Sequence, residues 1–168
     1  MQVALAVVGA IVAALLETSV ATLATIGGVK PDLVLVSSIA VVVTVGAELG
    51  FTWSFVGGLT LDMLSAPARP VGSSVVAIMI AVGLAAVIAR FVGRNRILIA
   101  VAVTFPLTFV FQFVFATLLS AVVGSLPVGD PLQATLPIAV ENTILALPVA
   151  ALARWTWLRW GSFDRIEW

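Results

Sequence analysis

Long apolar segments, separated by short polar breaks, run through almost the whole of this sequence. Apolar residues make up 62% of its 168 residues and charged residues only 10%, whereas an ordinary soluble domain carries about 25% charged residues. So few ionisable groups could not cover the surface of a water-soluble protein of this size. The pattern therefore predicts an all-α integral membrane protein.

The charge balance and the missing residue types exclude many functions. The chain has 8 basic and 8 acidic residues and contains neither His nor Cys. A net charge of zero gives no general attraction for nucleic acid. Without His or Cys there is no disulfide, no Ser-His-Asp or Cys-His catalysis and no metal site with those ligands. The sequence also lacks a Walker A loop, a Rossmann fingerprint, an HExxH motif and a GxSxG elbow, so we expect no enzymatic activity and no cofactor.

Apolar runs of the right length place six membrane spans. A helix crosses the hydrocarbon core of about 30 Å with about 20 residues, so six spans use about 120 residues and leave short loops. Residues 33–61 are too many for one span, and Gly46, Glu48 and Gly50 favour a tight turn between two short helices. The first run has no basic residue before Leu16, unlike a secretory signal, so we expect it to be retained. The predicted spans are residues 2–24, 33–45, 49–62, 73–91, 97–123 and 134–155.

Basic residues favour the cytoplasmic side when they lie in short loops beside a span. Residues 90–96 carry three arginines, and the tail from Arg154 to Arg165 carries three more. Two spans separate these segments, so both lie on one side, and both termini are then predicted to be cytoplasmic. A single span over residues 33–61 would move the amino terminus outside. Interfacial tryptophans are expected on the same cytoplasmic side, at Trp53, Trp155, Trp157 and Trp160.

Acidic residues within or at the ends of the spans are candidate functional residues, because a charged carboxylate at the bilayer centre costs about 2.5–3.5 kcal/mol. These residues are Glu17, Asp62 and Glu141, and Glu141 is followed by Asn142. They either hydrogen-bond between helices or form a ligand or partner site. A catalytic pair of Asp32 with Asp62 is disfavoured, because both lie at predicted outer boundaries.

Small residues recur every four positions in three of the spans, and such rows let helix backbones approach closely. The rows are Gly46, Gly50, Ser54 and Gly58; Ser73, Ala77, Ala81, Ala85 and Ala89; and Ala6, Ala10 and Ala14. They serve either packing within the bundle or an interface with another protein. The phenylalanines of the fifth span face either lipid or a helix of a partner protein. They are Phe105, Phe109, Phe111, Phe113 and Phe115.

Three motifs resemble the MreD family of bacterial rod-shape-determining membrane proteins. The first is Val-Lys-Pro-Asp-Leu-Val-Leu-Val at residues 29–36. The second covers residues 50–72, with Gly-Gly-Leu-x-x-Asp-x-Leu-Ser at 57–65 and Pro-x-Gly at 70–72, and the third is Asn-Thr-Ile-Leu-Ala-Leu-Pro at 142–148. The block at 57–72 is the most specific, and the resemblance covers essentially the whole chain. Two departures are Glu48, where such proteins often carry a basic residue, and Glu17, where an uncharged polar residue is more usual.

The resemblance implies a bundle of six transmembrane helices, similar in fold to the S components of energy-coupling-factor transporters. It implies both termini in the cytoplasm of a bacterium, with the chain in its cytoplasmic membrane among lipid. The implied role is a scaffold for lateral-wall peptidoglycan synthesis that pairs with MreC, a bitopic protein with one membrane helix. Through MreC it would reach the MreB filament, the SEDS glycosyltransferase and the class B transpeptidase. The candidate partner-binding or structural residues are Asp62, Gly50, Gly57, Gly58, Pro70, Gly72, Glu17, Glu141 and Asn142.

A second reading makes the chain a substrate-binding S component that captures a vitamin or a metal ion. The Ala6, Ala10 and Ala14 row would then dock on the transporter's coupling subunit, and Glu17 with Glu141 would line a pocket. The absence of His and Cys disfavours a transition metal, and the absence of Tyr leaves few polar aromatic groups for a vitamin ring. The resemblance to MreD favours the scaffold.

Overall fold

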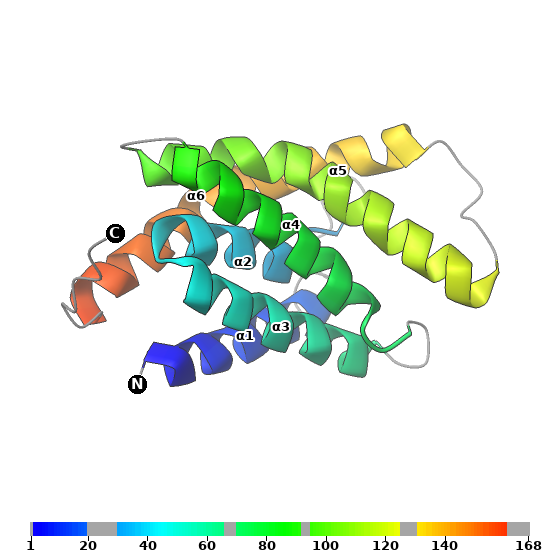
Figure 1. The fold of residues 1–168 in the computed structure, drawn as a ribbon, viewed down its shortest axis with the longest axis horizontal. Coiled ribbons are helices and arrows are strands. Elements are labelled where there is room, and N and C mark those ends of the chain that lie inside the picture. The colour runs from blue at the N-terminus through cyan, green and yellow to red at the C-terminus, as the bar shows by residue number, and fades with distance from the viewer. Residues whose placement is uncertain (1, 20–29, 66–69, 92–94, 125–130, 161–168) are drawn as a thin grey trace.

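A computed structural model describes residues 2–19, 30–65, 70–91, 95–124 and 131–160. Within these ranges every regular element is an α-helix (Figure 1). Four of the helices, α1, α4, α5 and α6, are long and apolar enough to cross a membrane, in agreement with an all-α, multi-pass membrane protein. The helices are α1 (Gln2–Ser19), α2 (Leu33–Thr44), α3 (Ala47–Leu64), α4 (Ser73–Phe91), α5 (Arg96–Val123) and α6 (Pro131–Trp160).

The helix boundaries lie close to the predicted ones, with two corrections. The turn after α2 is shorter than expected, because α3 already begins at Ala47 and takes in Glu48 and Gly50. Gly46 makes this turn with a φ of 155°, which residues with a side chain rarely adopt. The sixth helix is longer than expected at both ends, since residues 131–133 and 156–160 are helical. The predicted end of the first span at residue 24 lies outside the described residues.

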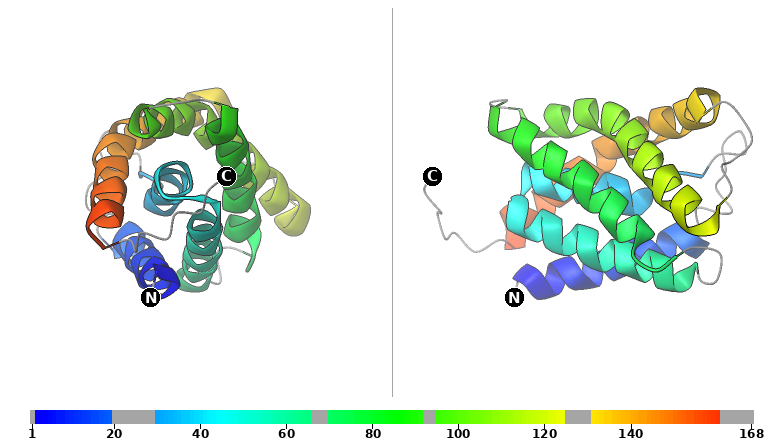
Figure 2. Two further views of the ribbon diagram at one scale, coloured as in Figure 1. Left: turned by 60° about the vertical axis from the view of Figure 1, so that its left-hand side comes forward. Right: turned by 45° about the vertical axis from the view of Figure 1, so that its right-hand side comes forward.

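The other five helices are arranged around α2 (Figure 2). Helix α2 lies at the centre and packs against all the others. Around it, α1 packs against α3, α3 against α4, α4 against α5 and α5 against α6. Helices α1 and α6 do not contact each other within the described residues. The ring around α2 is therefore open between the first and the last helix.

The sequence of α2 is compatible with its central place. Its residues are almost all apolar, and every residue from Val34 to Thr44 is buried. A helix without a polar face can pack against neighbours on all its sides. Its 12 residues extend over about 18 Å, which is shorter than the hydrocarbon core of a bilayer. The surrounding helices therefore separate α2 from lipid on most of its sides.

The helix order places the arginines of the described residues at one end of the bundle. Helix α1 begins at this end, α4 and α6 end there, and the α2–α3 turn lies there as well (Figure 1). Arg90 and Arg159 lie in the last turns of their helices, and Arg96 opens α5. The guanidinium of Arg159 lies 5.5 Å from the ring centre of Trp155. Arginines far apart in the sequence thus share one end of the molecule.

Candidate functional site

Asp62 joins the end of α3 to the start of α4. Its side chain is fully buried. Oδ2 accepts a hydrogen bond from the backbone N–H of Gly72 at 2.7 Å, and both carboxyl oxygens accept from the N–H of Ser74 at 3.2 Å. The first N–H groups of a helix lack partners within the helix, and its N-terminus favours negative charge. Asp62 therefore caps α4 from a neighbouring helix.

The Pro-x-Gly segment completes this connection. The carbonyl of Pro70 accepts hydrogen bonds from the backbone N–H and the hydroxyl of Ser73, at 3.2 and 2.8 Å. Gly72 has a φ of 99°, a conformation that favours glycine. In this conformation its N–H points at Asp62. Asp62, Pro70 and Gly72, which were candidates for a site, together build the connection between α3 and α4.

The glycines of α3 serve close packing on two sides. A Cβ placed on Gly50 would lie 2.7 Å from the Cα of Val42, and one on Gly57 would lie 2.6 Å from a methyl of Val34, both in α2. A Cβ placed on Gly58 would lie 2.9 Å from the Cα of Val75 in α4. The glycines therefore let α3 approach α2 and α4 closely.

The other rows of small residues also face the inside of the bundle. Ala10, Ala14, Ala77, Ala81 and Ala85 have no exposed surface, and Ala6 is 6% exposed. On α5, in contrast, Phe113 is 74% exposed and Phe105 is 37% exposed, whereas Phe111 is buried and stacks on Phe115. The small-residue rows thus serve packing within the chain, and one phenylalanine stripe of α5 faces outward.

A cluster of polar side chains holds the amino-terminal end of α2. Asn142 of α6 is fully buried, and its Oδ1 accepts a hydrogen bond from the backbone N–H of Asp32 at 2.9 Å. Its Nδ2 donates to Asp32 Oδ2 at 3.2 Å and to Thr108 Oγ1 at 3.3 Å. Gln112 Nε2 also donates to Asp32 Oδ2, at 3.3 Å. Helices α5 and α6 are thereby tied to the start of α2.

Glu17 binds the same end of α2 from another side. It is 3% exposed, and its Oε2 accepts a hydrogen bond from the backbone N–H of Val34 at 2.8 Å. Glu141 does not share this role, because it is half-buried and makes no hydrogen bond to another described residue. The pocket that the S-component reading gives to Glu17 and Glu141 stays a prediction, and neither residue lines the groove described below.

Sequence analysis overlooked part of this arrangement. Asp32 and Asp62 lie at two different helix starts, so they do not form a pair. Asp32, Gln112 and Thr108 were not among the candidates, although they form the cluster around Asn142. The Lys-Pro-Asp motif directly before α2 is a signal in the sequence for Asp32, because Asp is a preferred residue at the N-cap position that it occupies.

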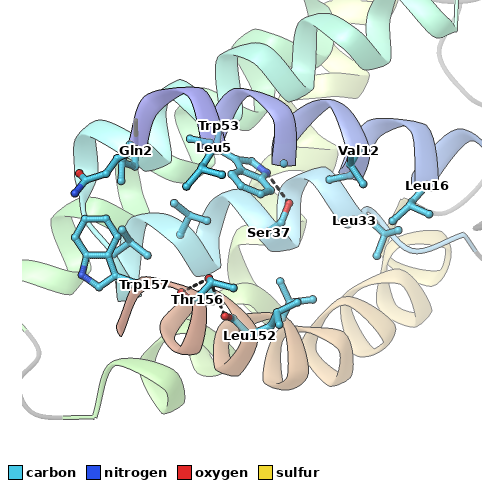
Figure 3. A pocket seen from close by; sticks show the side chains of 18 residues that line it. Gln2, Leu5, Val12, Leu16, Leu33, Ser37, Trp53, Leu152, Thr156 and Trp157 are labelled. Carbon is cyan, nitrogen blue, oxygen red and sulfur yellow. Dashed lines mark hydrogen bonds between the residues drawn. The ribbon is translucent and has the colours of Figure 1, made fainter. Parts of the chain in front are cut away.

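A groove runs along the open side of the ring (Figure 3). Its volume is about 590 Å³, and its lining comes from α1, α2, α3 and α6. Its floor is formed by Leu33, Ser37 and Val41 of α2 and by Val45, the residue that directly follows α2. No residue of the lining is charged. The lining residues are Gln2, Leu5, Ala6, Gly9, Val12, Ala13, Leu16, Leu33, Ser37, Val41, Val45, Leu49, Trp53, Val149, Leu152, Ala153, Thr156 and Trp157.

Trp53 shapes this groove from within the bundle. Its Nε1 donates a hydrogen bond to the hydroxyl of Ser37 at 2.8 Å (Figure 3). A Cβ placed on Gly9 of α1 would collide with the indole ring, so glycine at that position admits the tryptophan. The ring of Trp53 thus packs between α1 and α2, whereas Trp155 is 54% exposed.

Comparisons with protein-family models, with curated proteins and with solved structures find no match for this chain.

Proposed function

We propose that this protein is a non-enzymatic membrane scaffold of the MreD type. In this role it binds an MreC-like bitopic protein in the bacterial cytoplasmic membrane and thereby supports cell shape and lateral peptidoglycan synthesis. The MreB filament, the SEDS glycosyltransferase and the class B transpeptidase would be reached through that partner. The proposal starts from the three motifs that resemble the family.

The open side of the helix ring is the observation that carries the proposal. Four neighbouring pairs of helices close the ring around α2, but α1 and α6 leave an uncharged groove between them. In a membrane this opening faces lipid or another membrane helix. Because lipid gives no hydrophobic drive for helices to associate, a partner must be recognised by packing and shape. A groove with a defined shape supplies such a surface.

The residues that carry the resemblance support a scaffold in a second way. Asp62, Pro70 and Gly72 build the connection between α3 and α4, and Asn142 holds α2 in place through Asp32. Their polar atoms bind main chain and one another. They have a structural task that needs no reaction and no cofactor.

The membrane arrangement belongs to the same proposal. We place all six helices in the membrane, with α2 at the centre of the ring that the other five helices form. The arginine-bearing end of the bundle faces the cytoplasm, because basic residues near spans favour that side. Helix α1 begins and α6 ends at this end, so both termini are cytoplasmic.

The S-component alternative finds less support in the polar cluster around Asn142. A substrate site needs polar groups that are directed at a ligand. The amide groups of Asn142 and Gln112 instead bond to Asp32 and Thr108. Glu17 is directed at the backbone of α2. These groups hold helices together, so we favour the scaffold.

Co-purification tests the proposed function. The protein is co-expressed with the MreC-like bitopic protein of the same genome and solubilised in mild detergent, and we expect a stable complex. A control partner, in which an unrelated single-span helix replaces the membrane segment, should fail to co-purify. If neither partner binds, and calorimetry instead shows tight binding of a vitamin or metal ion, the protein is an S component.

A further inference from the structure

The groove between α1 and α6 is long and straight. Its floor residues Leu33, Ser37, Val41 and Val45 are four apart, so they follow one line along α2. The distance from the first to the last is about 18 Å at 1.5 Å per residue, or between three and four helical turns. The groove therefore has the length over which two membrane helices can pack side by side.

The middle of the groove's floor is buried. Ser37 is 8% exposed and Val41 is 7% exposed, and the indole of Trp53 lies against Ser37. A helix with its side chains is about 10–12 Å wide, so its backbone cannot reach this floor between α1 and α6. Only side chains can enter, while the axis of the visiting helix stays at the mouth of the groove.

The volume of the groove limits which side chains fit. A cavity of about 150 Å³ is enough to hold a benzene molecule. The groove, at about 590 Å³, therefore holds roughly four groups of that size. One large side chain per turn over three to four turns fills it, whereas glycine or alanine on the visiting helix would leave it empty.

The polarity of the lining indicates how the visiting helix lies. Val12, Leu16 and Leu33 make the far part of the groove apolar, whereas Gln2, Thr156 and Trp157 lie together at the end where α1 begins (Figure 3). Trp side chains favour the membrane interface. The visiting helix thus runs alongside α1, with its interfacial end at Gln2 and Trp157 and its apolar stretch beyond.

From these observations we infer that the groove between α1 and α6 is the seat of the partner's membrane helix. This inference rests on the proposed function. The helix is recognised by large apolar side chains such as Leu, Ile or Phe, one per turn, that enter the groove. Rows of small residues contribute little to this surface, because Ala6 is the one row member that lines the groove and the other row members of α1 and α4 named above are buried between the protein's own helices. The visiting helix closes the ring around α2.

Filling the groove tests this inference. Ala153 lines the groove, whereas Ala151 is exposed on the same helix and does not line it. Ala153→Phe should lower the recovery of the co-purified bitopic protein at least tenfold, and Ala151→Phe should leave it unchanged. Val12→Phe and Val8→Phe form a second pair on α1, in which only Val12 lines the groove. Thermal unfolding of each variant without the partner shows that it is folded.

An alanine scan of the partner's membrane helix tests the recognition. Loss of binding should recur every three to four residues and fall on large apolar residues. If filling the groove has no effect while the wild-type complex forms, the inference is wrong and the proposed function stands. If no complex forms with the wild-type protein, the proposed function fails, and this inference fails with it.

A lipid chain is the competing occupant. Native mass spectrometry of the purified protein in detergent measures bound phospholipid directly. If Ala153→Phe removes a bound phospholipid and leaves the bitopic complex intact, the groove is a lipid site and the inference is overturned. If the complex is kept by Ala151→Phe and Val8→Phe, which leave the groove open, and lost by Ala153→Phe and Val12→Phe, the result supports a membrane helix as the occupant of the groove.

Discussion

Three buried residues with a carboxylate or amide side chain act on the main chain at the starts of neighbouring helices. Asp62 accepts from backbone N–H groups at the start of α4, and Glu17 accepts from one at the start of α2. Asn142 does the same with the N–H of Asp32. Free N–H groups at a helix start need acceptors wherever water is excluded. The cost of burying these polar side chains is thus offset by the groups that they satisfy.

Substitutions at Asp62 should separate hydrogen bonding from charge. Oδ2 of Asp62 accepts hydrogen bonds from the N–H groups of both Gly72 and Ser74. An asparagine can place its side-chain oxygen at the same position, so Asp62→Asn should cost about 1 kcal/mol of stability. Asp62→Leu leaves two buried N–H groups without an acceptor and should cost about 3 kcal/mol or more. Thermal unfolding in detergent and the amount of protein in membranes measure both. Equal losses for the two variants would contradict the capping role.

At the scale of the helices, the close approach of α3 and α4 is the feature most sensitive to side-chain size. Gly58 faces the backbone of Val75, which cannot move aside without shifting α4. Gly50 faces the backbone of Val42 in α2 in the same way. The position of α3 therefore depends on the absence of a single carbon atom at each of these two residues.

Two glycine substitutions with opposite expected results test this dependence. Gly58→Ala places its Cβ 2.9 Å from the Cα of Val75 and should destabilise the protein by about 1–3 kcal/mol, as overpacking does. Gly83 of α4 has nothing within 4 Å of such a Cβ, so Gly83→Ala should stabilise the helix by about 0.5–1 kcal/mol. Thermal unfolding compares both with the wild type. A loss of stability in the Gly83 variant as large as in the Gly58 variant would show that close packing at Gly58 is not the cause.

At the scale of the whole molecule, two features matter for the protein in a membrane. The described helix ends that carry arginine lie on one side, and the ring around α2 is open between α1 and α6. Residue 95 and residue 71 lie at opposite ends of α4, on short connections between helices. The groove between α1 and α6 gives lateral access to α2. Orientation and partner binding can therefore be measured separately.

The orientation can be measured with single cysteines, because the natural chain has none. Asn95 and Val71 are both exposed. In intact cells, an impermeant thiol reagent should label Val71→Cys and leave Asn95→Cys unlabelled until the membrane is opened. The physical reason is that the arginines beside Asn95 favour the cytoplasm. The reverse pattern of labelling would invert the orientation.

Sequence reasoning by itself determined the membrane class, the number of helices and most of their boundaries. Apolar runs, glycine turns and proline breaks are local signals, so the limits of α4 and the turn at Gly46 could be read directly. The sequence also indicated Asp62, Gly72 and Asn142 as candidates, because polar residues and glycines are conspicuous in an apolar chain. Their structural partners could not be named, because hydrogen bonds such as that between Asn142 and Asp32 join residues 110 positions apart.

Only the tertiary structure decided which helix is central and where the bundle is open. In a soluble protein a helix without a polar face indicates a core position, but in a membrane every helix is apolar, so α2 carried no such signal. The inward direction of Trp53 depends on Gly9 in another helix, which no local pattern reveals. The gap between α1 and α6 is a property of how five helices pack around one, and it exists only once their side chains are placed together.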